Sequence, residues 1–222
     1  MKINKNNRNT KSKKIILIIL SIILIIMIAL AGYKIYDKYL SNNGKKHDIQ
    51  TVEKQTIELE NYDYYLHGNA TEYEKRLADD LKKVLSKEEV NFDEYAKVIS
   101  QLFISDLFTL DNKNGSSDIT SIQYVYDDYQ ATFKEIVKDT IYASIEVDLD
   151  GTRQQTLPSV TAVEIASITN NKFSYNGKVL DENAYYVKTN ITYEADLGYP
   201  TAYEVVLVKN NDLLQVVKAS KV

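Results

Sequence analysis

The chain has 222 residues, a net charge of −4 and no cysteine. Disulfides, thiolate metal sites and an acylated N-terminal cysteine are therefore excluded. The charge is unevenly divided, because the first fourteen residues hold six basic side chains and no acid, whereas all 31 acidic residues lie beyond residue 32. An acidic C-terminal part repels phosphate backbones, so we expect no nucleic acid partner.

A run of apolar residues begins at Ile15 and ends at Ala31, interrupted only by Ser21. At 1.5 Å per residue, a helix of this length spans about 26 Å, close to the thickness of a bilayer core. The basic residues before it should stay in the cytoplasm, as the positive-inside rule requires. The sequence thus predicts a single-pass membrane protein with a cytoplasmic tail (1–14), a transmembrane helix (15–32) and an extracellular C-terminal part.

A cleaved signal peptide is the alternative interpretation of the same segment. Ala29-Leu30-Ala31 has the small-x-small pattern of a cleavage site. The length of the apolar run, with no helix breaker before the alanines, favours a retained anchor. Both interpretations export the remainder, and an exported chain without disulfides is typical of a Gram-positive cell envelope. The lipid bilayer is therefore the first predicted partner.

The exported part divides into a polar stalk (33–64) and a domain (65–222) that begins with helix signals. Thr71 opens a capping box, in which a hydroxyl and a carboxylate three residues later satisfy free helix N–H groups, and Asn91 repeats that signal. A third helix is expected near Asp127 or Asp128. Its apolar face comprises Tyr129, Phe133, Ile136, Val137 and Ile141.

Beyond Pro158 the apolar pattern changes from helical spacing to alternation, which is typical of half-buried antiparallel strands. Val187, Thr189, Ile191 and Tyr193 alternate with polar neighbours, and Asn210-Asn211 suits a tight hairpin because asparagine tolerates positive φ. Helices followed by a strand meander indicate an α+β domain, with three helices packed on a curved antiparallel sheet.

This order of elements resembles the nuclear transport factor 2-like fold, a cone of helices wrapped by a bent sheet. The segment 122–129, Ile-Gln-Tyr-Val-Tyr-Asp-Asp-Tyr, which leads into the third helix, adds to the likeness. The tail, anchor and exported domain together resemble the bitopic assembly proteins of type IV secretion and Gram-positive conjugation channels. Members of the fold include enzymes, ligand binders and scaffolds, so the resemblance implies a fold but no single activity.

Few residues suggest catalysis. His67 is one of two histidines and could be a general base or pH sensor, but an ordinary surface position in a loop is the simpler interpretation. The acidic segment 146–151 lacks the glutamate that a calcium loop needs at its twelfth position. No phosphate-binding glycine loop or nucleophile elbow occurs. We therefore expect a non-enzymatic protein with no metal and no cofactor.

Tyrosine is abundant, with 18 copies, several of them in the strand half. Alternation places Tyr186, Lys188 and Thr192 on the strand face opposite Val187 and Ile191. Because tyrosine is enriched at interfaces, these three residues are the predicted protein-interaction site. The expected function is a membrane-tethered interaction or assembly module that binds envelope proteins or itself. The alternative is an envelope-acting enzyme or small-ligand binder that uses the cone cavity.

Overall fold

The computed structural model describes residues 55–56, 62, 64–148 and 150–222, all within one compact unit, Gln50–Val222. The predicted tail (1–14), the predicted anchor (15–32) and most of the predicted stalk lie outside these residues. Within the described part, no helix is both long enough and apolar enough to cross a membrane.

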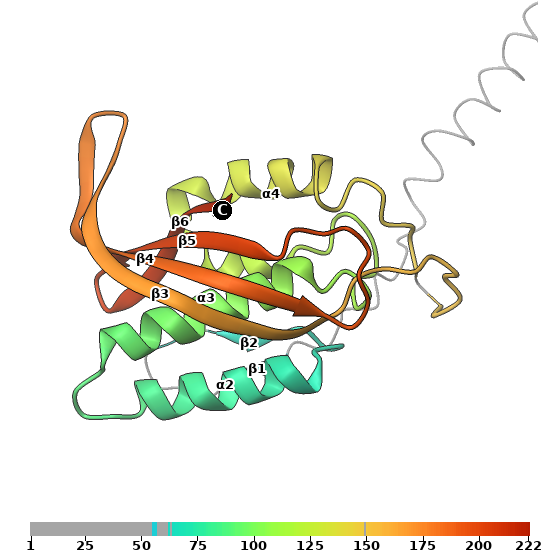
Figure 1. Ribbon diagram of the computed structural model, residues 1–222, viewed down its shortest axis with the longest axis horizontal. Coiled ribbons are helices and arrows are strands. Elements are labelled where there is room, and N and C mark those ends of the chain that lie inside the picture. The colour runs from blue at the N-terminus through green and yellow to red at the C-terminus, as the bar shows by residue number, and fades with distance from the viewer. Residues whose placement is uncertain (1–54, 57–61, 63, 149) are drawn as a thin grey trace, which may run out of the picture. The chain divides into compact units, whose positions relative to one another are not determined.

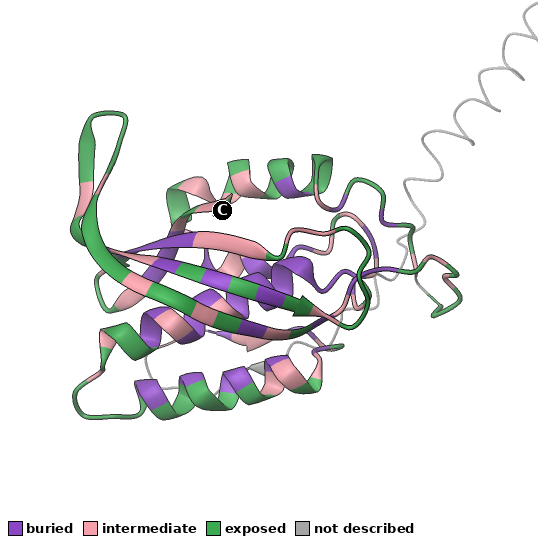
Figure 2. Cartoon of the chain, in the orientation of Figure 1, coloured by how far each residue is buried: buried purple, intermediate pink, exposed green. Residues whose placement is uncertain are grey.

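The first two predicted helices are confirmed. Helix α2 (Glu72–Leu85) begins at the Thr71 capping box, in which the threonine hydroxyl and the Glu74 carboxylate each accept from the other residue's backbone N–H. Helix α3 (Phe92–Phe108) begins at Asn91, whose side chain accepts from two backbone N–H groups. One side of α3 packs on α2 and another on the sheet, so most of its side chains are buried (Figure 2).

The third helix starts slightly later than its acidic signal. A short 3-10 helix, η3 (Asp127–Tyr129), occupies the predicted start, and α4 (Gln130–Asp139) follows it directly. No side chain caps the N-terminus of α4. A second 3-10 helix, η2 (Thr120–Tyr124), precedes η3 and packs on α3. The structure thus has the three predicted helices, and α4 lies on the far side of α3 from α2 (Figure 1).

The strand half is a four-stranded antiparallel meander of β3 (Val160–Tyr175), β4 (Lys178–Tyr193), β5 (Ala202–Asn210) and β6 (Leu213–Lys221), in that spatial order. A single parallel bridge between Val125 and Val216 extends the pairing beyond β6. Two short strands, β1 (Gln55–Thr56) and β2 (Tyr65–Leu66), form a separate pair. The α+β class with three helices on an antiparallel sheet is therefore confirmed.

The strands β3 and β4 are longer than their partners. Strand β5 pairs with β4 only from Tyr185 to Asn190, so the distal parts of β3 and β4 form a two-stranded arm that bends away from the sheet (Figure 1). Asn176 and Gly177, both with positive φ, form its tip, as a two-residue hairpin turn of this hand requires. The β5–β6 hairpin turns one residue later than predicted, at Asn211-Asp212, where Asn211 has φ 55°.

The main core lies between the helices and the inner face of the sheet. Val187, Thr189 and Ile191 are buried there, as their alternation predicted. Tyr64, placed in the predicted stalk, also lies in this core, and its hydroxyl is hydrogen-bonded to that of Tyr95. The folded unit therefore includes residues before 65.

Side chains from the helices complete the hydrogen bonds of the outer edge of β3. The backbone N–H of Val163 donates to the hydroxyl of Tyr73 over 2.8 Å. The carbonyl of Val163 accepts from the Gln101 amide over 2.7 Å and from the Tyr73 hydroxyl over 3.2 Å. These bonds tie α2 and α3 to the sheet edge, and they leave both backbone groups of Val163 satisfied.

Candidate functional site

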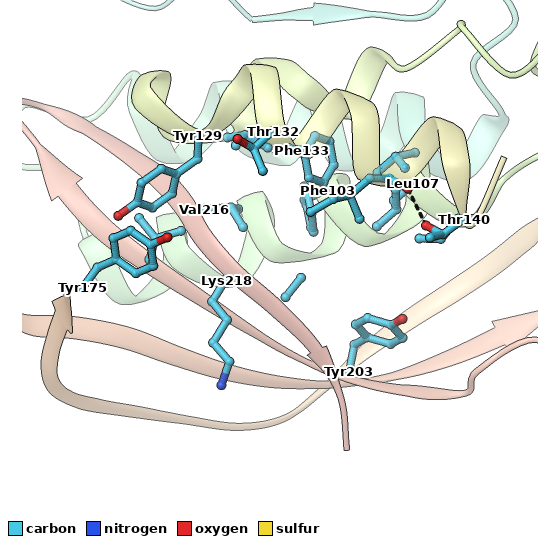
Figure 3. Close-up of a pocket in the computed structure, with 16 residues that line it drawn as sticks. Phe103, Leu107, Tyr129, Thr132, Phe133, Thr140, Tyr175, Tyr203, Val216 and Lys218 are labelled. Atoms are coloured by element: carbon cyan, nitrogen blue, oxygen red, sulfur yellow. Dashed lines mark hydrogen bonds between the residues drawn. The ribbon is translucent and has the colours of Figure 1, made fainter. Parts of the chain in front are cut away.

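An open cleft of about 590 Å³ lies between α4 and the inner side of β5 and β6 (Figure 3). We call it the α4 cleft. One wall comes from α3 and the sheet, with Phe103, Leu107, Val216 and Ala219, and the other comes from α4, with Phe133, Ile136 and Val137. Most of the lining is apolar. The cleft therefore suits an apolar group better than a polar substrate.

The cleft stays open because only one row of α4 side chains, Phe133 and Val137, packs against the core. Val137 is 2 % exposed and Phe133 packs on Phe103 with ring centroids 5.8 Å apart, whereas Ile136 remains 56 % exposed. The predicted apolar face of α4 is thus present, but its outer part faces the cleft instead of other side chains. When a ligand covers a large apolar side chain that is exposed in this position, the burial of apolar surface stabilises the complex.

Polar groups lie at the rim of the cleft. The lining includes Tyr129, Tyr175 and Tyr203, and its single charged residue is Lys218, which pairs with Val206 across β5 and β6 and so points to the outer face of the sheet, toward Glu204. Partial burial raises the pKa of Tyr203, and burial together with the neighbouring Tyr175 raises the pKa of Tyr129. Both phenols therefore stay protonated at neutral pH and act as hydrogen-bond donors or acceptors, which favours binding over acid–base chemistry.

A buried ion pair lies elsewhere, where α3 meets the loop that follows it. The Lys113 ammonium, on a side chain 1 % exposed, donates to the Asp106 carboxylate over 2.5 Å and to the Thr120 hydroxyl over 3.2 Å. The Thr120 hydroxyl in turn donates to Asp106 over 2.5 Å. A buried charge needs such partners. These charges satisfy one another and do not line the α4 cleft.

His67 is buried, 4 % exposed, so the expectation of an ordinary surface position was wrong. Its Nδ1 accepts the backbone N–H of Asn69 over 3.1 Å, and its Nε2 therefore carries the proton and donates to Asp118 over 2.9 Å. Burial alone would raise the pKa of the Asp118 carboxyl, but hydrogen bonds from His67 and from the Asn114 N–H outweigh it and lower that pKa. Both ring nitrogens are occupied in joining two loops, which indicates a structural role.

Glu74 combines a structural role with an altered pKa. Burial, and then the negative charge of Asp106, raise the pKa of its carboxyl above 4.5, although Lys113 and the hydrogen bonds from Thr71 oppose the change. The folded state therefore binds this proton more tightly than the unfolded state does. The stability contributed by that proton is present in full at low pH and is lost as the pH rises through the folded pKa.

We therefore expect Glu74→Gln to flatten the fall in unfolding free energy as the pH is raised from about 4.5 to neutrality. Glutamine keeps the oxygen that accepts from the Thr71 N–H but has no charge to bury. Urea unfolding at a series of pH values measures the slope. Glu72→Gln is the control, because the Lys75 hydrogen bond lowers the pKa of the exposed Glu72 carboxyl. An unchanged slope in Glu74→Gln would contradict this assignment.

The predicted interaction residues lie on the outer face of β4. Lys188 and Thr192 are exposed, whereas Tyr186 is only half exposed. The Tyr186 ring packs against a small second cluster that includes Val206 and Val208, and its hydroxyl donates to the Lys172 carbonyl over 3.2 Å. Part of the Tyr186 ring is therefore covered by residues of the same chain. The three residues remain a predicted protein-interaction site.

Comparison with known proteins gives no further assignment, because no protein-family model, curated protein or solved structure matches the chain. Among the described residues, no group of three or more histidine, aspartate or glutamate side chains is arranged to hold a metal ion. The candidate site therefore has to be judged on its own geometry.

Proposed function

We propose that the chain is a non-enzymatic, membrane-tethered binding module of the bacterial cell envelope, and that an apolar group of its ligand enters the α4 cleft. One observation carries the proposal: the cleft is lined mostly by apolar side chains. The buried ionisable side chains Glu74, Asp106 and Lys113 do not line this cleft, and Lys113 and Asp106 are paired with each other. This separation favours binding over catalysis, because a catalytic acid or base has to reach the substrate.

A second candidate contact is the outer face of β4. Lys188 and Thr192 are exposed there beside the half-exposed Tyr186 ring. A protein partner could cover this face while the cleft holds a smaller group. The likeness in topology to bitopic assembly proteins of conjugation and secretion channels agrees with such a partner, and we propose that role for this face.

The cleft is tested by Ile136→Asp. The full chain is reconstituted in bilayer nanodiscs and exposed to a photoreactive decanol analogue, and labelled peptides are mapped by mass spectrometry. We expect labelling of α4 and β6 in the parent chain and its loss in Ile136→Asp, because a carboxylate desolvated by an apolar ligand is costly. The unfolding free energy should change by only about 0.5 kcal/mol, because the Ile136 side chain is largely exposed. Labelling that is absent from α4 and β6 of the parent chain would refute cleft binding.

The proposed membrane topology is tested by protease treatment of intact protoplasts. If residues 33–222 face the exterior, the protease removes the domain and leaves a short membrane-bound stub. Lysed protoplasts serve as the control for cleavage from both sides. Complete protection of the domain in intact protoplasts would reverse the proposed orientation.

A further inference from the structure

Strand β6 forms one edge of the four-stranded sheet. The rest of the chain bonds to the backbone of this edge where the Tyr126 N–H donates to the Val216 carbonyl over 2.9 Å, and it then turns into η3 and α4. Across the residues that the structure describes, no hydrogen bond from outside the sheet reaches the backbone of residues 217–221. The second half of β6 is therefore a free edge.

The strand register shows which backbone groups face this free edge. The Val222 N–H donates to the Ala202 carbonyl of β5 over 3.3 Å, so these two residues form a hydrogen-bonded pair. Bonded and non-bonded pairs alternate in an antiparallel ladder, so Ser220 bonds to β5, whereas Lys221 and Ala219 do not. The N–H and C=O groups of Ala219 and Lys221 therefore point away from the sheet.

The free edge runs beside the α4 cleft. The cleft lining includes Val216 and Ala219 of β6 together with Phe133 and Ile136 of α4. Neighbouring side chains of a strand point to opposite faces, so a strand added next to Ala219 places every second side chain in the cleft. When a peptide adds to a sheet edge, main-chain bonds supply affinity and pockets for alternate side chains supply specificity. The edge and the cleft together provide both.

The charges of β6 indicate which kind of strand fits. The sequence of β6 contains Lys218 and Lys221 and no acid. Lys218 pairs with Val206 and lies on the outer face of the sheet, where the outward side chains of an added strand would be its neighbours. Opposite charges on adjacent strands attract and like charges repel. Acidic outward side chains are therefore favoured, and a second copy that adds through its own β6 edge is disfavoured.

We infer that the β6 edge binds an extended segment of a partner protein, with apolar residues at alternate positions and acidic residues between them. The segment's backbone bonds to Ala219 and Lys221, its apolar side chains enter the α4 cleft, and its acids lie on the outer face near Lys218. The inference rests on the proposed function and names its ligand, because the apolar group in the cleft is then a side chain of the partner.

A capped peptide of sequence Val-Glu-Val-Glu-Val tests this mode of binding on the full chain in nanodiscs, with empty nanodiscs as the reference. Added peptide should slow amide hydrogen exchange at Ala219 and Lys221, because both N–H groups become hydrogen-bonded. Ser220 is the internal control, since its N–H already bonds to β5. A peptide N-methylated at every residue keeps the side chains but has no backbone donors, so it should give no protection.

The acidic residues are tested with a peptide in which glutamine replaces glutamate. Its affinity for the full chain, measured by calorimetric titration, should be about three-fold lower, because cross-strand charge pairs contribute an effect of this size. Equal affinities of the two peptides would overturn the preference for an acidic segment.

Ala219→Pro tests the edge from the protein side. Proline has no N–H and is tolerated in a strand where that group faces away from the sheet. The affinity for the peptide should fall about ten-fold, because a hydrogen bond is lost and a peptide carbonyl is left unpaired, while the unfolding free energy should change little. Ser220→Pro is the contrasting variant, and it should be clearly less stable because it removes a bond to β5. Equal destabilisation by the two prolines would overturn the assigned register and the free edge with it.

The remaining outcomes separate the inference from the proposed function. Equal protection by the parent and N-methylated peptides, or protection by neither, overturns strand addition, whereas labelling of α4 and β6 by the decanol analogue would still support the cleft. Protection of Ala219 and Lys221 that rises with protein concentration without peptide assigns the edge to a second copy and overturns the partner segment. Absence of reporter labelling in the parent chain removes the proposed function, and the inference falls with it.

Discussion

Lys113→Met is expected to lower the free energy of unfolding by about 3–5 kcal/mol, because it leaves the Asp106 carboxylate buried without its cation. Lys113 is almost fully buried, and its ammonium joins Asp106 and Thr120. Methionine fills similar space, so the loss should come from the orphaned charge instead of from a cavity. Chemical denaturation at neutral pH measures it.

Two further variants separate this explanation from a packing defect. Lys97→Met removes a more exposed lysine that pairs with Glu94 over 2.8 Å, and it should cost less than about 1 kcal/mol. Combining Lys113→Met with Asp106→Leu removes both charges and should recover much of the loss. A double variant as unstable as Lys113→Met alone would show that the charge is not the cause.

Phe108→Ala is the other large expected loss, about 3–5 kcal/mol. The Phe108 side chain is 1 % exposed at the end of α3, and its ring meets the ring of Tyr203 on β5 with centroids 4.9 Å apart. The substitution removes an aromatic contact between the helix layer and the sheet and leaves a cavity.

The matched control for that variant is Phe133→Ala on α4. Phe133 is only partly buried and faces the α4 cleft, so its removal should cost clearly less in denaturant unfolding. Equal losses in the two variants would mean that α4 belongs to the core as firmly as α3 does, and would argue against a cleft that receives a ligand.

The parts of the fold that were predicted correctly are those in which local chemistry decides. Thr71 and Asn91 are each followed three residues later by a glutamate, a local pattern that favours a helix N-terminus, and the alternation around Ile191 predicts one buried strand face. The start of α4 was less well defined. The acids that suggested it, Asp127 and Asp128, form a 3-10 turn, because acidic side chains are compatible with either kind of helix start.

The candidate site was harder to predict, because it depends on distances between elements. The stripe on α4 contained the signal, since Phe133 and Ile136 had to face something apolar, but the sequence does not say whether protein atoms or open space lies opposite. Lys218 had no local signal, because an isolated lysine on a strand is common. His67 was assigned to the surface because its partner, Asp118, is 51 residues away in the chain.

The bonds that Tyr73 and Gln101 make to Val163 bear on how the protein behaves at high local concentration. An uncovered sheet edge is a template on which a strand of another molecule can add, and this is a route to aggregation. The helices block that route where β3 borders the core. The distal arm lacks such cover, since its strands bond chiefly to each other. The Lys172–Glu182 pair there keeps charged side chains on the arm, which discourages edge-to-edge stacking of neighbouring copies.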